Sequence, residues 1–226
     1  MEKLAEDDEK RIQRASFQGD PNIGLFAFAT DKYVIAPEGL DTSVLRVPTI
    51  HLQVGRTNLN GIFLAGNSNG IIVPWIIAEK EMKNLEAAAK KIGVPVHKLE
   101  SKHTVCGNLI LCNDHGAVAS PLLRKNLAEI KKVLGVRVME RNMMDLDIPG
   151  SLAVATNKGF LLSMHSSAAD LKFLKKALCV DGDIGTVNFG SGFVKSGIIA
   201  NSYGLIIGEQ TTGPEISRIT EALKFI

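Results

Sequence analysis

The stretch Gly61-IFLAGNSN-Gly70 combines a short apolar run with a polar turn that ends in glycine. Three more stretches align with it without gaps: Gly107-NLILCNDH-Gly116, Gly150-SLAVATNK-Gly159 and Lys195-SGIIANSY-Gly204. A fifth, Gly24-LFAFATDK-Tyr33, has the same length and closes on tyrosine. The closing positions 33, 70, 116, 159 and 204 lie 37, 46, 43 and 45 residues apart, and such self-similarity indicates an architecture of five repeated modules.

Each repeated stretch predicts a β-hairpin. An apolar strand enters a polar turn, in which Asn and Gly adopt positive φ at low steric cost. A second apolar strand then follows the turn. The expected second strands are Val34–Ala36, Ile71–Val73, Ala117–Ala119, Phe160–Leu162 and Leu205–Ile207.

Apolar residues recur at helical spacing after four of the five hairpins, and this periodicity predicts an amphipathic helix in each of those modules. The first module has only Asp41–Leu45, which suffices for a single turn. The helices are expected at Glu79–Ile92, around Leu123, Leu127, Ile130 and Leu134, around Leu171, Leu174 and Leu178, and around Ile216, Ile219 and Leu223. Third strands are expected at Thr49–Gln53, Val94–Leu99, Val136–Arg141 and Gly182–Val187.

The fifth module has no third strand of its own, and we expect Arg11–Phe17 to fill that place and close a ring. Ring closure leaves only short, protected strand edges. The sequence therefore predicts one α/β domain over residues 11–226, a closed ring of five ββαβ modules with pseudo-fivefold symmetry. The first ten residues contain five acids and two lysines, and we expect them to form a disordered extension.

Composition narrows the class of protein. The chain has 226 residues, of which 45% are hydrophobic and 22% charged, as is usual for a globular protein. No apolar run approaches the roughly 18 residues of a membrane span. Three cysteines are too few for a disulfide framework, and a cytoplasmic setting is expected. A net charge of +2 argues against the alternative of a generic RNA-binding protein, which needs a continuous basic face.

Five motifs resemble those of a known family, the archaeal form of translation initiation factor 6, over Ser16 to Ile226. The family has the pentein-type fold, a ring of five modules. The motifs are Gly66-Asn-Ser-Asn-Gly70, Gly107-Asn-Leu-Ile-Leu-Cys-Asn113, Gly185-Thr-Val-Asn-Phe-Gly-Ser191, Ile199-Ala-Asn201 and Thr211-Thr-Gly-Pro-Glu215. The acidic N-terminal extension is a departure from that family.

The resemblance implies a non-enzymatic factor that binds the large ribosomal subunit on its intersubunit face and sterically prevents joining of the small subunit. It further implies a role in biogenesis of that subunit and contacts with a uL14-type ribosomal protein near the sarcin–ricin loop. We expect a monomer without cofactor, metal, membrane or small-molecule substrate. We expect the ribosome-binding residues on one rim of exposed, module-joining loops: Asn108, Asn188, Gly190, Ser191, Asn201, Thr211 and Thr212.

An enzyme is the alternative within the same architecture. Guanidine-modifying hydrolases and amidinotransferases use a Cys nucleophile with a His base and carboxylates. The cysteines here are Cys106, Cys112 and Cys179, and none lies near the C-terminus, where that enzyme family places its nucleophile. Convergence of a Cys, a His and a carboxylate in the central cavity would favour the enzyme.

Two further patterns resemble ligand sites. The spacing of His103, Cys106, Cys112 and His115, with His97 nearby, is similar to that of zinc ligands. If Gly107 to Cys112 is one strand, however, about 3.3 Å per residue separates its ends by nearly 20 Å, too far for one metal ion. The glycine-rich stretch Gly190 to Ser196 lacks the spacing of a phosphate-binding loop, and we expect a tight turn there.

Overall fold

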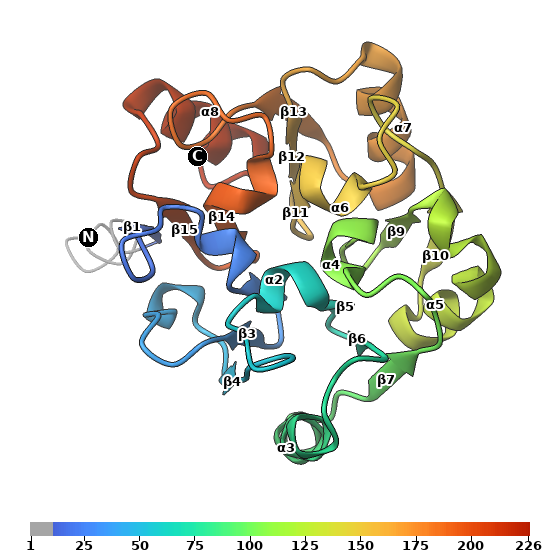
Figure 1. Cartoon of the computed structure of the whole chain (residues 1–226). Coiled ribbons are helices and arrows are strands. Elements are labelled where there is room, and N and C mark those ends of the chain that lie inside the picture. Colours follow the sequence, from blue (N-terminus) through green and yellow to red (C-terminus); the bar gives the residue numbers. More distant parts are fainter. Residues whose placement is uncertain (1–10) are drawn as a thin grey trace.

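The computed structural model describes residues 11–226, so the expectation for Met1–Lys10 lies outside the described residues. Five three-stranded sheets are arranged around a central axis (Figure 1). Within each sheet the first two strands are antiparallel, and the third is parallel to the second. The predicted ring of five α/β modules with pseudo-fivefold symmetry is confirmed.

The strands of the first four sheets follow the order of the chain. The first module contains β2 (Phe28–Ala29), β3 (Val34–Ala36) and β4 (Thr49–His51), and the second contains β5 (Ala65–Asn67), β6 (Gly70–Pro74) and β7 (Val96–Leu99). The third contains β8 (Ile110–Cys112), β9 (Gly116–Ala119) and β10 (Arg137–Glu140), and the fourth contains β11 (Ala153–Ala155), β12 (Phe160–Ser163) and β13 (Gly182–Gly185). All the second and third strands lie where the pattern of the sequence predicts them.

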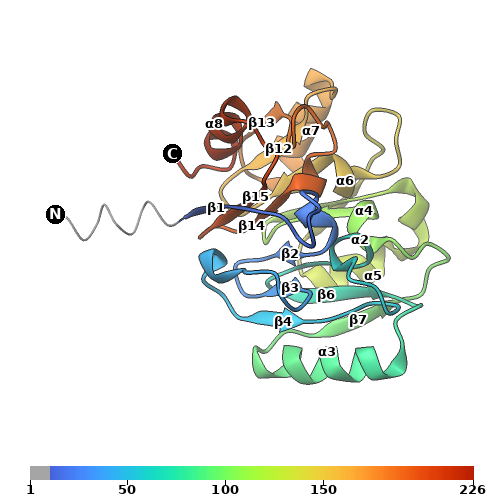
Figure 2. The same cartoon turned by 60° about the vertical axis from the view of Figure 1, so that its left-hand side comes forward.

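The fifth sheet closes the ring. It contains β14 (Ile198–Ala200), β15 (Leu205–Gly208) and the N-terminal strand β1 (Ile12–Ala15), which pairs in parallel with β15 (Figure 2). Arg14 adds a side-chain hydrogen bond to the carbonyl oxygen of Thr211 at 2.9 Å. Phe17 is buried in the apolar cluster between the last and first modules. The predicted closure by the start of the chain is confirmed.

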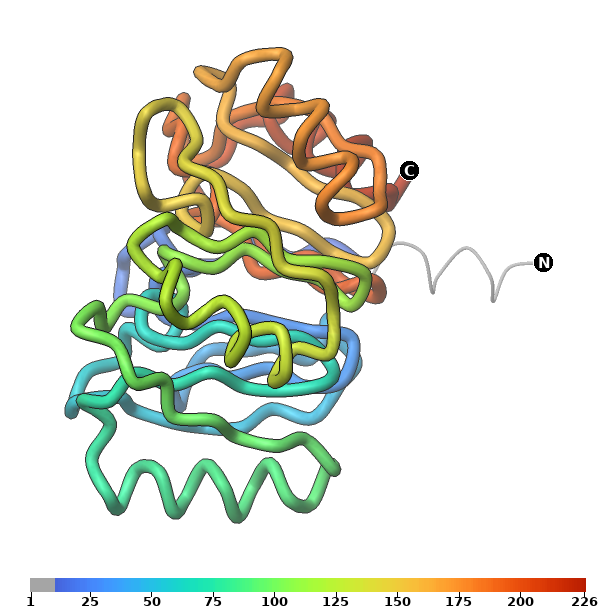
Figure 3. Tube along the Cα trace, turned by 90° about the vertical axis from the view of Figure 1, so that its right-hand side faces the viewer, coloured from blue at the N-terminus to red at the C-terminus, as the bar shows by residue number. Residues whose placement is uncertain are grey.

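Helices cover the outer side of the sheets, as Figure 3 shows for α3. They are η2 (Ser43–Leu45), α3 (Glu79–Lys91), η3 (Pro121–Asn126) with α5 (Leu127–Leu134), α7 (Ala168–Leu178) and α8 (Gly213–Ala222). Pro214 lies in the first turn of α8, and Gly135 ends α5 with φ 65°. Among the described residues, no helix is both long and apolar enough to cross a membrane.

One local expectation is wrong. Each repeated stretch begins with a helical turn rather than a strand, so Gly107 to Cys112 is not one strand and β8 begins only at Ile110. These turns are η1 (Ile23–Leu25), α2 (Asn60–Phe63), α4 (Cys106–Leu109), α6 (Pro149–Leu152) and η4 (Val194–Gly197). A Cβ on Gly61 would lie 2.0 Å from the carbonyl oxygen of Gly24, so the turns pack too closely around the axis for a side chain there.

The apolar core is divided among the module boundaries. Tyr33 and Ile35 of the first module are buried together with Ile71 and Val73 of the second. The four other clusters likewise combine residues of two neighbouring modules. No single module therefore buries its own apolar faces, and the ring is expected to unfold as one cooperative unit.

Deletion of residues 1–17 should destabilise the ring by about 3 kcal/mol or more, because it removes the strand partner of β15 and the buried ring of Phe17. Deletion of residues 1–10, the matched control, should change the melting temperature little. Thermal unfolding followed by circular dichroism measures both variants. Equal melting temperatures would show that the β1–β15 pairing contributes nothing to stability.

Candidate functional site

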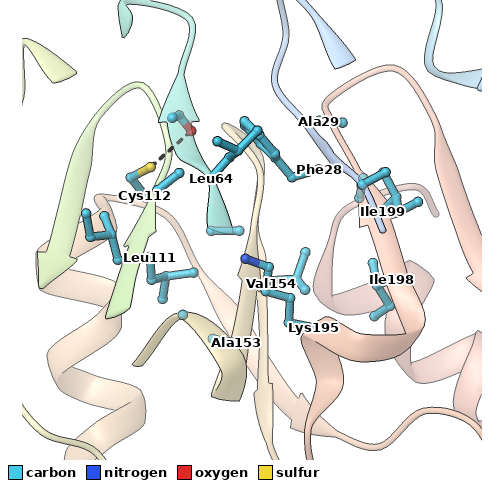
Figure 4. Close-up of a pocket in the computed structure, with 17 residues that line it drawn as sticks. Phe28, Ala29, Leu64, Leu111, Cys112, Ala153, Val154, Lys195, Ile198 and Ile199 are labelled. Carbon is cyan, nitrogen blue, oxygen red and sulfur yellow. Dashed lines mark hydrogen bonds between the residues drawn. The ribbon is translucent and has the colours of Figure 1, made fainter. Parts of the chain in front are cut away.

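The inner strands β2, β5, β8, β11 and β14 surround an axial cavity of about 70 Å³ (Figure 4). Its lining is mostly apolar, with Phe28, Leu64 and Ile199 among the larger side chains. Cys112 and Lys195 are the titratable residues in this lining. Burial raises the pKa of the Cys112 thiol to about 12, so the thiol stays protonated at neutral pH.

The cavity lies between two different ends of the ring. The hairpin turns lie at one end, which we call the turn end, and the short helices lie at the other, which we call the helical-turn end. Figure 1 shows α2, α4 and α6 grouped around the axis at the helical-turn end. Since the second strand of each module returns from the hairpin and the third is parallel to it, the loops that follow both strands also lie at the helical-turn end.

Asparagine side chains join neighbouring modules at the turn end. Asn67 donates to the carbonyl oxygens of Asn113 and Leu134 at 3.1 and 2.9 Å. Asn201 makes the equivalent pair of bonds, to Thr30 at 3.0 Å and Leu45 at 2.9 Å. Asn201 is only 1% exposed. The expectation that it lies on an exposed rim with Asn108 is therefore wrong, because it is buried at the opposite end of the axis.

The next residue of each turn completes a polar ring at the same end. The amide of Asn157 donates to the carboxylates of Asp31 and Asp114 at 2.7 and 2.6 Å. Ser68 donates to Asp114 from both its backbone N–H and its hydroxyl. The backbone N–H of Ser202 donates to Asp31 at 2.7 Å. The carboxylates at the turn end are thus satisfied by neighbouring modules.

The helical-turn end has a depression of about 340 Å³, the axial depression. Two predicted site residues, Asn108 on α4 and Ser191 in the loop after β13, meet in its lining although 83 residues separate them in the sequence. The depression is otherwise lined by Asn22, Gly24, Leu25, Gly61, Ile62, Ser151, Phe193, Lys195 and Ser196. No side-chain hydrogen bond to Asn108 occurs among the described residues, so its amide is available to a partner.

The loop after β13 is held in a fixed shape by Glu215 on α8. The carboxylate accepts hydrogen bonds from the backbone N–H groups of Phe189, Gly190 and Thr212, and from the Thr186 hydroxyl. Burial alone would raise the pKa of Glu215, but these hydrogen bonds outweigh burial and hold the pKa below its usual value. The two motifs of the family resemblance, around Asn188 and around Thr212, are thereby joined in space.

Thr211 differs from the expectation. It is fully buried, and its hydroxyl accepts from the backbone N–H of Asn188 at 3.1 Å and donates to the side-chain oxygen of Asn188 at 3.2 Å. Its expected position in an exposed loop is therefore wrong. Thr212 is the half-buried N-cap of α8, whereas Gly190, with φ 99°, is exposed.

Sequence reasoning missed the aromatic residues of this loop. Phe189 is 83% exposed and Phe193 is 50% exposed. Phe189 has φ 64°, a conformation that bulky residues rarely adopt. The only signal in the sequence is a phenylalanine within a glycine-rich, polar loop, which by itself does not distinguish an exposed ring from a buried one.

The described residues do not assemble the chemistry of the alternative functions. Neither a histidine nor a carboxylate lines the axial cavity beside Cys112. His97 pairs with Glu129 of the next module, at the boundary between β7 and α5. Within residues 11–226, no group of three or more His, Cys, Asp or Glu side chains is arranged to hold a metal ion.

A family model described as the eIF-6 family matches residues 12–222. The chain belongs to the eIF-6 family. The translation initiation factor 6 of Staphylothermus marinus is 40% identical over 220 residues, 94% of this chain and 97% of that protein. That of Pyrococcus horikoshii is 38% identical over 225 residues, covering 95% and 99%, and that of Saccharolobus islandicus is 40% identical over 222 residues, covering 94% and 98%. These relatives are translation factors, and this family member is accordingly not an enzyme.

Replacement of Asn201 by alanine should destabilise this eIF-6 family member by about 2 kcal/mol, since it removes two hydrogen bonds between modules and leaves two buried carbonyl oxygens unpaired. Asn108→Ala, the matched control, should change stability by less than about 0.5 kcal/mol. Urea unfolding of both variants checks the difference. An Asn201 variant as stable as the control would contradict the structural role assigned to this side chain.

Proposed function

We propose that this protein binds the large ribosomal subunit on its intersubunit face through the helical-turn end of the ring, and that its bulk there sterically prevents joining of the small subunit. Family membership supports a role in translation initiation. One structural observation supports this choice of surface: six of the nine exposed large hydrophobic residues found within residues 11–226 lie at this end. They are Trp75, Leu122, Leu146, Met164, Phe189 and Phe193.

The topology explains why these side chains share one end. Trp75, Leu122 and Met164 each follow the second strand of a module, and Leu146 follows a third strand. Because both kinds of strand end at the helical-turn end, residues from three modules face the same side of the molecule. Exposed large apolar side chains that gather at one end of a globular protein are compatible with a protein-interaction site there.

The turn end offers less to a partner. Its polar side chains, among them Asn67, Asn113 and Asp114, are engaged in hydrogen bonds with neighbouring modules. At the helical-turn end, by contrast, the Asn108 amide is free of side-chain bonds among the described residues, and Phe189 is almost fully exposed. Polar groups that already have partners add little to binding, whereas exposed aromatic rings are common hot spots of interfaces.

The loop after β13 supports an anchoring role for Phe189. Three equivalent turns of the ring bridge residues three positions apart, Phe17 to Asp20, Val54 to Thr57 and Met143 to Leu146, but this one bridges Val187 to Ser191. Positive φ is common to these turns, since Gln18, Arg56 and Met144 adopt it as well. In the longer turn the exposed non-glycine residue with positive φ is Phe189, and its backbone N–H donates to Glu215. Backbone strain of order 1 kcal/mol persists where the surrounding structure holds it, often at binding sites.

The finer assignments follow from the family and belong to the same proposal. The aromatic and amide groups of this end suit a ribosomal protein of the uL14 type, in the vicinity of the sarcin–ricin loop. Asn108, Asn188, Gly190, Ser191 and Thr212 would contribute to this contact, whereas the buried Asn201 and Thr211 would stabilise the fold. The protein would act as a cytoplasmic monomer, and its binding would also accompany biogenesis of the large subunit.

Phe189→Ala and Asn108→Trp should each weaken binding to purified large subunits at least tenfold, the first by loss of an anchor and the second by obstruction of the axial depression. Gly190 is a poorer probe because its φ of 99° strains any side chain placed there. Co-sedimentation through sucrose gradients measures binding, and light scattering measures subunit joining.

The matched control is Lys132→Trp, which adds the same bulk on α5. The C-terminus of that helix lies at the turn end, where the Leu134 carbonyl accepts from Asn67 and Asn69. This variant should change affinity less than threefold. The proposed surface is wrong if Lys132→Trp abolishes binding while Phe189→Ala and Asn108→Trp, with wild-type melting temperatures, still block joining.

A further inference from the structure

Lys195 breaks the repeat at the axis. The other four modules have glycine at the equivalent position: Gly24, Gly61, Gly107 and Gly150. A Cβ on each of these glycines would lie 1.9–2.2 Å from the carbonyl oxygen of the equivalent residue in the preceding module. Glycine therefore satisfies the packing at this position, and closure of the ring gives no reason for a lysine.

The side chain of Lys195 extends into the axial cavity (Figure 4). Its Nζ reaches from the fifth module to the third, which are not neighbours in the ring, and donates to the carbonyl oxygen of Gly107 at 2.7 Å. An ammonium group has three donors, and this bond uses one of them. The remaining donors face a mostly apolar lining, where an uncompensated charge is costly.

Among residues 11–226, no carboxylate side chain lines the axial cavity around Nζ. The cavity lining is aliphatic and aromatic apart from backbone and Cys112 on β8. That thiol is protonated and donates to the carbonyl oxygen of Gly66 at 3.1 Å. The carboxylates of Asp31 and Asp114 line a small adjoining cavity toward the turn end, which shares Cys112 with the axial cavity. Their oxygens accept hydrogen bonds from Asn157, Ser68 and Ser202.

We propose that the axial cavity is a binding site for one small monovalent anion of the size of chloride, held by the Lys195 ammonium. The volume of about 70 Å³ is ample for a single halide, since a site of about 10–15 Å³ by the same measure already holds one water. Larger oxyanions such as phosphate need several converging donors, and the apolar lining does not supply them. Lys195 also lines the axial depression of the proposed ribosome contact, but the anion site is the axial cavity itself, and its tests need no ribosome.

The titration of Lys195 gives the anion a measurable signature. Burial lowers the pKa of Lys195 to about 8, with a small opposing contribution from Cys112. The unfolded chain has a lysine pKa of about 10.4, so between these two values the unfolded state binds more protons and stability rises with pH. A bound anion favours the protonated amine, so chloride should stabilise the protein most below pH 8 and less above it.

Thermal unfolding of the full chain at pH 6.5, in sodium chloride against sodium gluconate of equal ionic strength, tests the proposal. Gluconate is too large for the cavity. At tenfold excess over its dissociation constant, chloride should raise the melting temperature by about 3 °C. Lys195→Met and Lys195→Gly, which restores the glycine of the other modules, should abolish the difference between the two salts. An equal chloride response in wild type and both variants would overturn the proposal.

Crystals of the wild-type protein soaked in sodium bromide give a test that does not depend on the variants folding. An anomalous peak within about 3.5 Å of Lys195 Nζ, in the axial cavity, would support the site. Bromide found only at the surface, as an adventitious ion only, would refute it whatever the melting curves show.

Discussion

The structure depends on one constraint: no module can bury its apolar faces without the next module. The second strands are buried on all sides, yet the side chains that cover them come from the neighbouring repeat, as Leu134 and Val136 of the third module do for Ile72 of the second. Each boundary is therefore both a core and an interface. The closed ring follows from this constraint, because a boundary without a partner module would expose a full apolar cluster. The pairing of β1 with β15 is the same constraint applied to the two ends of the chain.

The second constraint acts at the axis, where five repeats must converge. Four repeats have glycine at their first position. Because glycine has no Cβ, the helical turn can pack directly against a carbonyl oxygen of the neighbouring turn. At the other end, Asn67, Asn113 and Asn201 reach across to carbonyl oxygens of the next module. Close backbone packing at one end and amide hydrogen bonds at the other hold the inner strands at the spacing that leaves only a small cavity.

The elements that local patterns determine were predictable from the sequence, and those that depend on another module were not. A short apolar run after a polar turn suffices to place β3, and apolar residues at helical spacing suffice to place α3, since both signals are local. The helical turn at Gly107 was missed because it packs against the carbonyl oxygen of Gly61, a residue 46 positions away in the sequence. Asn201 was misplaced for a related reason. An asparagine before a tight turn has the same local signature whether its amide faces solvent or reaches the next module.

Pseudo-symmetry separates structural positions from functional ones without reference to any other protein. Where the modules share a residue, as at the axial glycines, the same close packing recurs at each boundary and explains the residue. Where one module has a different residue from its equivalents, this shared packing does not explain the difference. Phe189 exposes an aromatic ring in a turn one residue longer than its three counterparts, and Lys195 places an amine in the axial cavity where glycine suffices elsewhere. Both departures occur in the loop and helical turn that lead into β14. Both side chains therefore lie between the fourth sheet and the sheet that closes the ring, and neither takes part in the pairing of β1 with β15. Both have a proposed role in binding rather than in folding.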